Sequence, residues 1–139
     1  MPRQLRELVR RRDGNRCGYC RLIQLGQASV FHINHVIPRS AGGVTMESNL
    51  VLQCPSCSLH KSDKRHARDP ETGDVVLLFN PLEQRWSQHF RLLEDGTCVG
   101  LTDVGRATCA ALRMNDTLPR LARGIQLRIG LLSIDEVNS

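Results

Sequence analysis

The sequence has few aromatic residues, no long apolar run and no internal repeat. Its 139 residues include one Trp, one Tyr and three Phe, which excludes a wide aromatic platform for stacking single-stranded bases. No stretch has the length and hydropathy of a membrane span, and the basic N-terminal segment lacks the apolar centre of a secretory signal. We therefore expect a cytoplasmic protein with no membrane partner, in a reducing compartment where cysteines bind metal more often than they form disulfides.

Positive charge is concentrated in the first half of the chain. Residues 1–68 contain 12 Lys and Arg against 4 Asp and Glu, a net charge of +8, whereas residues 69–139 have a net charge of −3. This asymmetry favours one face that meets a polyanion, although solvated helix faces would give the same count. The net charge changes sign at the Asp-Pro-Glu-Thr-Gly stretch at 69–73. We therefore predict a core at 1–68 and an extension at 69–139 that packs on this core.

Residue periodicity and turn signals predict an α+β fold. A basic amphipathic helix should end at the Asp13-Gly14 turn, and Pro38 should end the first strand. The other expected elements, in chain order, are a strand at 28–37, a loop at 39–43, a turn and apolar segment at 47–52, a knuckle and helix at 54–64, a buried strand at 75–79, a hairpin with strands at 89–93 and 98–101, a helix capped by Thr102, and a last helix at 118–132.

Two C-x2-C pairs, Cys17/Cys20 and Cys54/Cys57, are separated by 33 residues. Both thiolates of such a turn can point at one ion, and two turns form a closed tetrahedral site that is typical of structural Zn2+. Disulfides or redox chemistry are the alternatives. Because the site offers no open position, we do not expect this metal to be catalytic. The remaining cysteines, at 98 and 109, are single, and we expect them to be buried.

The residues between the cysteine pairs carry a specific pattern. It consists of FHINHVIPRSAGG at 31–43, SNLVL at 48–52 and CPSCSLHK at 54–61. Over about residues 5–66 the chain resembles the HNH endonuclease family, whose zinc-stapled members have C-x2-C pairs on both sides of a ββα-metal core. The resemblance implies such a core here, with an N-terminal helix and a C-terminal extension of a hairpin and helices. The stretches at 69–73 and 79–90 also resemble an extension found after the core in some bacterial members.

The resemblance implies catalytic roles for His35 and Asn49. His35 matches the first-motif histidine, the general base, and Asn49 matches the asparagine that orients this histidine through its side-chain carbonyl. The chemistry suits these residues, because an imidazole near neutral pKa can take a proton from an attacking water while a divalent ion stabilises the developing charge. Taken singly, His35 would be an ordinary packed or surface histidine and Asn49 a turn residue; their place between the cysteine pairs favours the catalytic interpretation.

Two positions depart from the family pattern. Asn34 stands where an acidic metal ligand usually precedes the catalytic histidine, and Ser58 stands where His or Asn usually follows the last cysteine. Both are neutral oxygen donors, so we expect weakened binding of a hard cation. His32, which shares strand parity with Asn34, and His60 are candidate substitutes, although each could equally be a surface or backbone-bonded histidine. Regular alternation would place Asn34 and His35 on opposite faces, so a bend is needed if both serve one site.

Imidazole ligands would favour Zn2+, Ni2+ or Mn2+ over Mg2+ as the catalytic ion. Basic residues beside the motifs are expected to bind phosphates, with the arginines at 10–12 as a second patch. The first group comprises Arg39, Lys61, Lys64, Arg65 and Arg68. Nothing in the sequence encodes the reading of bases.

The sequence therefore predicts a metal-dependent endonuclease that hydrolyses nucleic-acid phosphodiesters, with DNA as the expected substrate. The alternative, favoured by Asn34 and Ser58, is an HNH-fold nucleic-acid-binding protein with weakened catalysis. A zinc-scaffolded adaptor for other proteins is a third interpretation, which the basic half of the chain disfavours.

Overall fold

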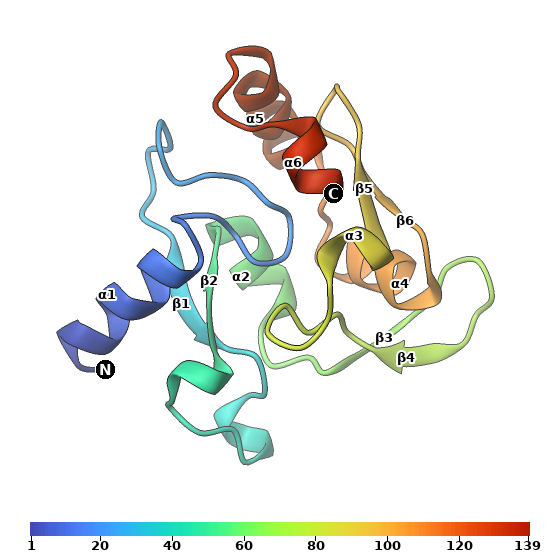
Figure 1. Cartoon of the computed structure of the whole chain (residues 1–139). Coiled ribbons are helices and arrows are strands. Elements are labelled where there is room, and N and C mark those ends of the chain that lie inside the picture. The colour runs from blue at the N-terminus through green and yellow to red at the C-terminus, as the bar shows by residue number, and fades with distance from the viewer.

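A computed structural model describes all residues, 1–139, as an α+β fold with three two-stranded antiparallel sheets (Figure 1). No helix has both the length and the apolar character needed to cross a membrane. The helices are α1 (Arg3–Arg12), α2 (Pro55–Lys61), α3 (Trp86–His89), α4 (Asp103–Ala111), α5 (Thr117–Arg128) and α6 (Ile134–Asn138). The strands are β1 (His32–His35), β2 (Leu50–Gln53), β3 (His66–Arg68), β4 (Val75–Leu77), β5 (Phe90–Leu92) and β6 (Cys98–Gly100), with short 3-10 turns at Arg39–Ala41 and Glu47–Asn49.

The N-terminal part of the chain contains α1, the β1–β2 hairpin and α2. Strand β1 is shorter than the predicted 28–37 because its partner β2 has only four residues, ended by a 3-10 turn on one side and Pro55 on the other. Helix α1 ends at Arg12, as predicted, and its arginines tie it to this hairpin. The Arg10 guanidinium donates to Phe31 O at 3.0 Å, and that of Arg12 donates to Glu47 O at 2.6 Å and to Leu50 O. These two arginines are therefore engaged within the fold rather than free as a phosphate patch.

The β3–β4 ribbon corrects two expectations about the middle of the chain. Of the segment predicted as a buried strand at 75–79, only residues 75–77 form a strand, and Val75 and Leu77 are 57% and 56% exposed. Strand β4 pairs with β3, a strand that the sequence analysis did not predict. The β3–β4 ribbon packs on α4 with one face only, so alternate residues of the ribbon point to solvent. The boundary proposed between residues 68 and 69 lies in the loop of this hairpin.

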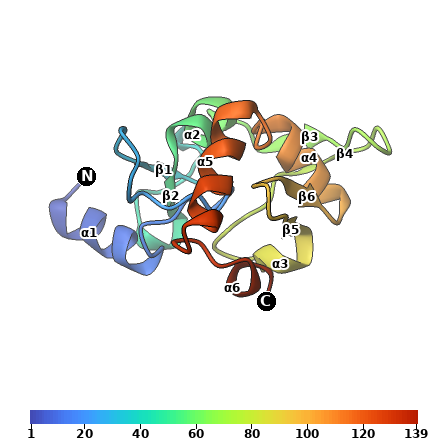
Figure 2. The ribbon, with the colours of Figure 1, turned by 90° about the horizontal axis from the view of Figure 1, so that it is seen from above.

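One apolar core joins the two parts of the chain. Trp86 stacks on Phe90 with ring centroids 5.1 Å apart, and its Nε1 donates to Tyr19 O of the first cysteine knuckle at 2.7 Å. Helix α5 lies across the seam between the β1–β2 part and the β5–β6 hairpin (Figure 2). There the Gln126 side chain accepts from Ile23 N at 2.9 Å and donates to Ile23 O at 2.7 Å. The extension is thus continuous with the core in packing.

The C-terminal elements mostly follow the sequence signals. The β5–β6 hairpin forms as expected, and Thr102 Oγ1 caps α4 by accepting from Gly105 N at 3.1 Å. The last predicted helix, at 118–132, is α5, which ends at Arg128, and a further helix, α6, follows it and is capped by Ser133. Gly124 lies within α5, where a Cβ would lie 2.8 Å from Asp95 O, so glycine allows α5 to pack against the hairpin turn.

The loop between β3 and β4 is anchored by a buried carboxylate. Arg106 of α4 binds Asp69 with two hydrogen bonds, Nε to Oδ1 at 3.0 Å and Nη2 to Oδ2 at 2.8 Å. Glu71 N and Thr72 Oγ1 also donate to this carboxylate, each at 3.0 Å. The Arg106 guanidinium is the largest cause that holds the pKa of Asp69 well below its usual range. The Asp-Pro-Glu-Thr-Gly stretch therefore has a structural role in joining the ribbon to α4.

We expect Asp69→Asn to lower the melting temperature, because the substitution removes the charge that Arg106 pairs with inside the fold. Glu71→Gln is the matched control, since Glu71 also contacts Arg106 Nε, at 3.1 Å, but its side chain is 69% exposed. The control should cost less than about 1 kcal/mol. Thermal unfolding of both variants checks this, and equal melting temperatures would contradict a dominant role for Asp69.

Candidate functional site

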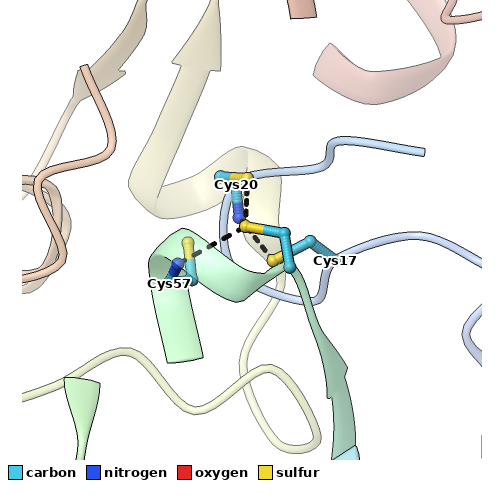
Figure 3. A group of neighbouring side chains, drawn as sticks. Cys17, Cys20 and Cys57 are labelled. Atoms are coloured by element: carbon cyan, nitrogen blue, oxygen red, sulfur yellow. Dashed lines mark hydrogen bonds between the residues drawn. The ribbon is translucent and has the colours of Figure 1, made fainter. Parts of the chain in front are cut away.

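Four buried cysteines from two distant segments meet at the centre of the fold. Cys17 and Cys20 lie in the first knuckle, Cys54 caps α2 and Cys57 lies in its first turn. Their sulfur atoms all lie within 4.8 Å of one another, and Figure 3 shows those of Cys17, Cys20 and Cys57 turned toward a common centre. Each pair also makes the same turn: Cys20 N donates to Cys17 Sγ at 3.5 Å and Cys57 N donates to Cys54 Sγ at 3.4 Å.

This cluster fits a tetrahedral metal ion. All four thiols are free, and the Sγ atoms of Cys20 and Cys54 are 3.7 Å apart, too far for a disulfide. Tetrahedral Zn2+ with four thiolates would separate its sulfur atoms by about 3.8 Å. The predicted four-cysteine set is therefore assembled in the structure, and its geometry is compatible with a structural zinc site. Cys98 is buried as expected, and Cys109 is half-buried.

A second polar cluster lies where β1 faces α2. Asn34 Nδ2 donates to Ser58 Oγ and to Gln53 Oε1, both at 2.6 Å, and His32 Nδ1 lies 3.1 Å from the same Ser58 oxygen. Strand parity thus places His32 and Asn34 together, as the alternation predicts. Sequence reasoning missed Gln53, a buried glutamine on the partner strand that holds the Asn34 amide. The cluster offers nitrogen and oxygen donors to a cation but no carboxylate.

The His35 side chain makes a different contact from the one the resemblance implies. Its Nε2 lies 2.8 Å from Thr45 Oγ1. The Asn49 amide instead bonds the backbone: Oδ1 accepts from Ile37 N at 2.9 Å, and Nδ2 donates to Ile37 O and Val44 O, both at 3.0 Å. Asn49 therefore acts on His35 only indirectly, by holding the loop that carries Thr45.

The same loop needs a glycine. A Cβ at Gly43 would lie 1.7 Å from Ile37 O and 2.9 Å from Asn49 Nδ2, so only glycine allows this close approach. Thr45 follows two residues later, and sequence reasoning missed it. The one available signal was a hydroxyl residue two positions after the glycine pair.

Residues 17–64 match the family model described as HNH endonuclease. These residues are an HNH domain. The match begins at the first cysteine pair and includes both clusters, so the family resemblance and the α+β fold are confirmed, with a four-cysteine cluster that is compatible with a zinc site. Comparisons with curated proteins and with solved structures gave no match.

Lys61 of the HNH domain is buried, which corrects its prediction as a phosphate contact. Its side chain is directed inward, because Lys61 lies one turn after Cys57 on α2. Its Nζ donates to Val36 O at 3.1 Å and to His35 O at 3.4 Å. Burial lowers the pKa of Lys61. Lys61 therefore fixes the backbone at the end of β1.

Burial and two nearby positive charges affect the pKa of His35. Partial burial is the main cause that lowers its pKa from the ordinary value, and the charges of Arg39 and Lys61 lower it further. A lowered pKa keeps the imidazole neutral, and hence basic, at neutral pH.

His60 is separate from the His32, Asn34 and Ser58 cluster. Two residues along a helix correspond to about 200° of rotation, so His60 and Ser58 lie on different sides of α2. The His60 Nδ1 bonds Ser56 O of its own helix at 2.8 Å. This contact matches the backbone-bonded alternative for His60. The other predicted phosphate contacts, Arg39, Lys64, Arg65 and Arg68, are exposed.

We expect purified protein to contain about one zinc ion per chain, because the four thiols form one closed set of ligands. Cys57→Ser should lose the ion and unfold, since structural zinc supplies on the order of 10 kcal/mol of folding free energy in small domains. Cys109→Ser is the matched control, because Cys109 lies outside the cluster. Elemental analysis and circular dichroism check both results. Folded wild-type protein without zinc would contradict the structural role.

Proposed function

We propose that the protein is an HNH-type endonuclease that hydrolyses DNA phosphodiester bonds with a divalent metal ion and His35 as general base. The observation that carries this proposal is the position of His35 in the HNH match, on a strand whose neighbouring side chains offer donors to a cation. The net charge of +8 over residues 1–68 supports a polyanionic substrate.

The hydrogen bonds of His35 suit a general base. Its contact with Thr45 occupies Nε2 and leaves Nδ1 without a partner. When Thr45 Oγ1 accepts a hydrogen bond from Nε2–H, the lone pair of Nδ1 is available to take a proton from the attacking water. The lowered pKa of His35 keeps that lone pair free at neutral pH. In this arrangement Thr45 sets the tautomer, and Asn49 holds the loop that positions Thr45.

The donors for a catalytic ion are Asn34 Oδ1, Ser58 Oγ and the His32 ring. The Asn34 amide already directs its Nδ2 toward Gln53 and Ser58, which leaves Oδ1 without a hydrogen bond. A set of one imidazole and two neutral oxygens fits Zn2+, Ni2+ or Mn2+ better than Mg2+. A bound divalent ion would supply charge stabilisation to the phosphate and the leaving oxygen.

One observation favours a second candidate function. Asn34 and Ser58, which replace the usual ligands, bond each other at 2.6 Å and can satisfy one another without a cation. The chain could then bind DNA through the exposed residues Arg39, Lys64, Arg65 and Arg68 and cut it poorly or not at all.

The two functions differ in a nicking assay on supercoiled plasmid with Mg2+, Mn2+, Ni2+ or Zn2+. We expect the wild-type protein to nick the plasmid. In His35→Ala the nicking rate should fall by at least about 100-fold, because general-base catalysis contributes about that factor. His66→Ala is the matched control, an exposed histidine beyond the HNH match.

Zinc content and DNA binding are measured on the same samples, so that loss of the scaffold is distinguished from loss of the base. DNA binding without nicking in any metal would support the second candidate. Neither binding nor nicking would contradict both and would favour the protein adaptor.

Asn34→Asp tests the cation donors separately. A carboxylate binds hard cations better than an amide, so we expect nicking with Mg2+ or Mn2+ to rise by about 10-fold or more. The Gln53 amide can accommodate the change, because its Nε2 is buried without a partner and can turn to donate to the new carboxylate. Unchanged or lower activity in Asn34→Asp, with zinc content intact, would mean that this position does not contact the ion.

A further inference from the structure

Helix α5 carries an apolar face that the rest of the chain leaves uncovered, on the side seen in Figure 2. Four large aliphatic residues along the helix and its C-terminal cap are 46–79% exposed and are spaced i, i+3, i+7 and i+11: Leu118, Leu121, Ile125 and Ile129. This spacing places them on one side of the helix. Leu25, which is also exposed, lies beside Ile125 and Ile129 and extends the patch. A contiguous exposed apolar patch of this kind marks an interaction surface.

A hollow lies on each side of this apolar stripe. The smaller, of about 540 Å³, lies between α5 and the loop that carries Leu25. The larger, of about 910 Å³, lies between α5, the β5–β6 turn and the start of α6. Ile125 lines both hollows, so it stands on the ridge between them. A ridge with a hollow on each side is complementary to a second copy of the same surface, because helices pack ridges into grooves.

The larger hollow also contains charges of both signs. Glu94 and Asp95 of the β5–β6 turn line it together with Arg120 and Arg128 of α5. None of these four residues belongs to an ion pair of the chain. The turn packs along residues 120–124, whereas Arg128 lies at the C-terminal end of α5. The acidic and basic charges are therefore displaced from each other along the helix.

This displacement decides how two such faces can meet. A two-fold dimer brings the same surface of both copies together, with the α5 helices either parallel or antiparallel. In the antiparallel arrangement the larger hollows share one edge of the interface, and Arg128 of each copy lies toward the acidic turn of the other. The parallel arrangement places the larger hollow over the smaller one, which has no acidic residue. We propose that this chain forms a two-fold dimer through antiparallel α5 helices, with the apolar stripe buried and Arg128 of each copy beside Glu94 of the other.

The proposed dimer leaves the HNH site uncovered. No residue of β1 or α2 lines either hollow, and the loop at 37–45 lies at the opposite end of the molecule from α5 in Figure 1. Each dimer therefore presents two copies of the His35 site. The inference goes beyond the proposed nuclease function and does not depend on it.

Sedimentation equilibrium of the full chain, purified with zinc, tests the apolar contact. We expect a monomer–dimer equilibrium with a dissociation constant of about 10 µM, because one helix face is smaller than a standard stable interface. Ile125→Glu should raise this constant by at least about 10-fold, since it buries a charge in the contact. Val75→Glu is the matched control: Val75 is 57% exposed against 60% for Ile125, and it lies on β4 outside both hollows. The control should stay within about threefold of wild type.

Charge reversal at two exposed residues tests the antiparallel arrangement. Glu94→Arg and Arg128→Glu each place like charges together at both ends of the dimer, so each variant alone should dimerise about 10-fold more weakly. A mixture of the two variants restores both opposite-charge pairs, and we expect heterodimers with the wild-type dissociation constant. A contact within one chain would not recover on mixing. Asp95 is left unchanged, because its Oδ1 accepts from Thr97 N at 3.0 Å and shapes the turn.

Circular dichroism and zinc content show whether each variant is folded, and the charge reversals decide the outcome if Ile125→Glu is not. A wild-type protein that stays monomeric at about 100 µM would overturn the proposal. So would a dimer that Ile125→Glu leaves intact, or a mixture of the two charge reversals that does not recover. A monomeric wild type whose DNA binding falls in Ile125→Glu but not in Val75→Glu would also overturn it and would assign this face to nucleic acid.

Discussion

The meeting of four cysteine thiols is the constraint on which the rest of the structure depends. It joins the knuckle after α1 to the start of α2, and the β1–β2 hairpin is the chain between them. The main aromatic contact with the extension is made at this knuckle, where the Trp86 indole binds Tyr19 O. A core of this size gains from a metal because it buries a limited apolar surface. The positions of Ser58 and Asn34 follow from the cluster, since Ser58 comes directly after Cys57 and Asn34 lies opposite Val51 on the hairpin.

The parts of the fold that could be predicted from the sequence are those determined by local chemistry. Cysteine spacing places the thiols together, a threonine before a helix caps it, and strand alternation brings His32 and Asn34 to one face. The short elements α3, α6 and β3 could not be predicted, because segments of three to five residues owe their conformation to the surfaces they pack on rather than to their own propensity.

Tertiary packing also determines the contacts of those site residues whose roles the sequence analysis did not predict correctly. Lys61 and Lys64 are equivalent as charges, yet the phase of α2 set by Cys57 turns Lys61 toward β1, whereas Lys64 follows the end of the helix and is exposed. Helical periodicity counted from Cys57 could have predicted the inward direction of Lys61. For Asn49 and Thr45 no such signal existed, because the choice between a backbone and an imidazole partner depends on the path of the loop at 37–45. The HNH motif therefore indicated the correct segment of the chain but the wrong side-chain contact for Asn49.

The HNH match ends at residue 64, but the physical unit does not. Gln126 of α5 supplies hydrogen bonds to Ile23 beside the first knuckle, and Trp86 Nε1 donates to Tyr19 O within that knuckle. At Asn34 and Ser58 the chain offers a cation neutral oxygen donors, and the cysteine cluster lies in the shared apolar core. The extension packs directly on the knuckle that carries Cys17 and Cys20, so it is not a separate appendage.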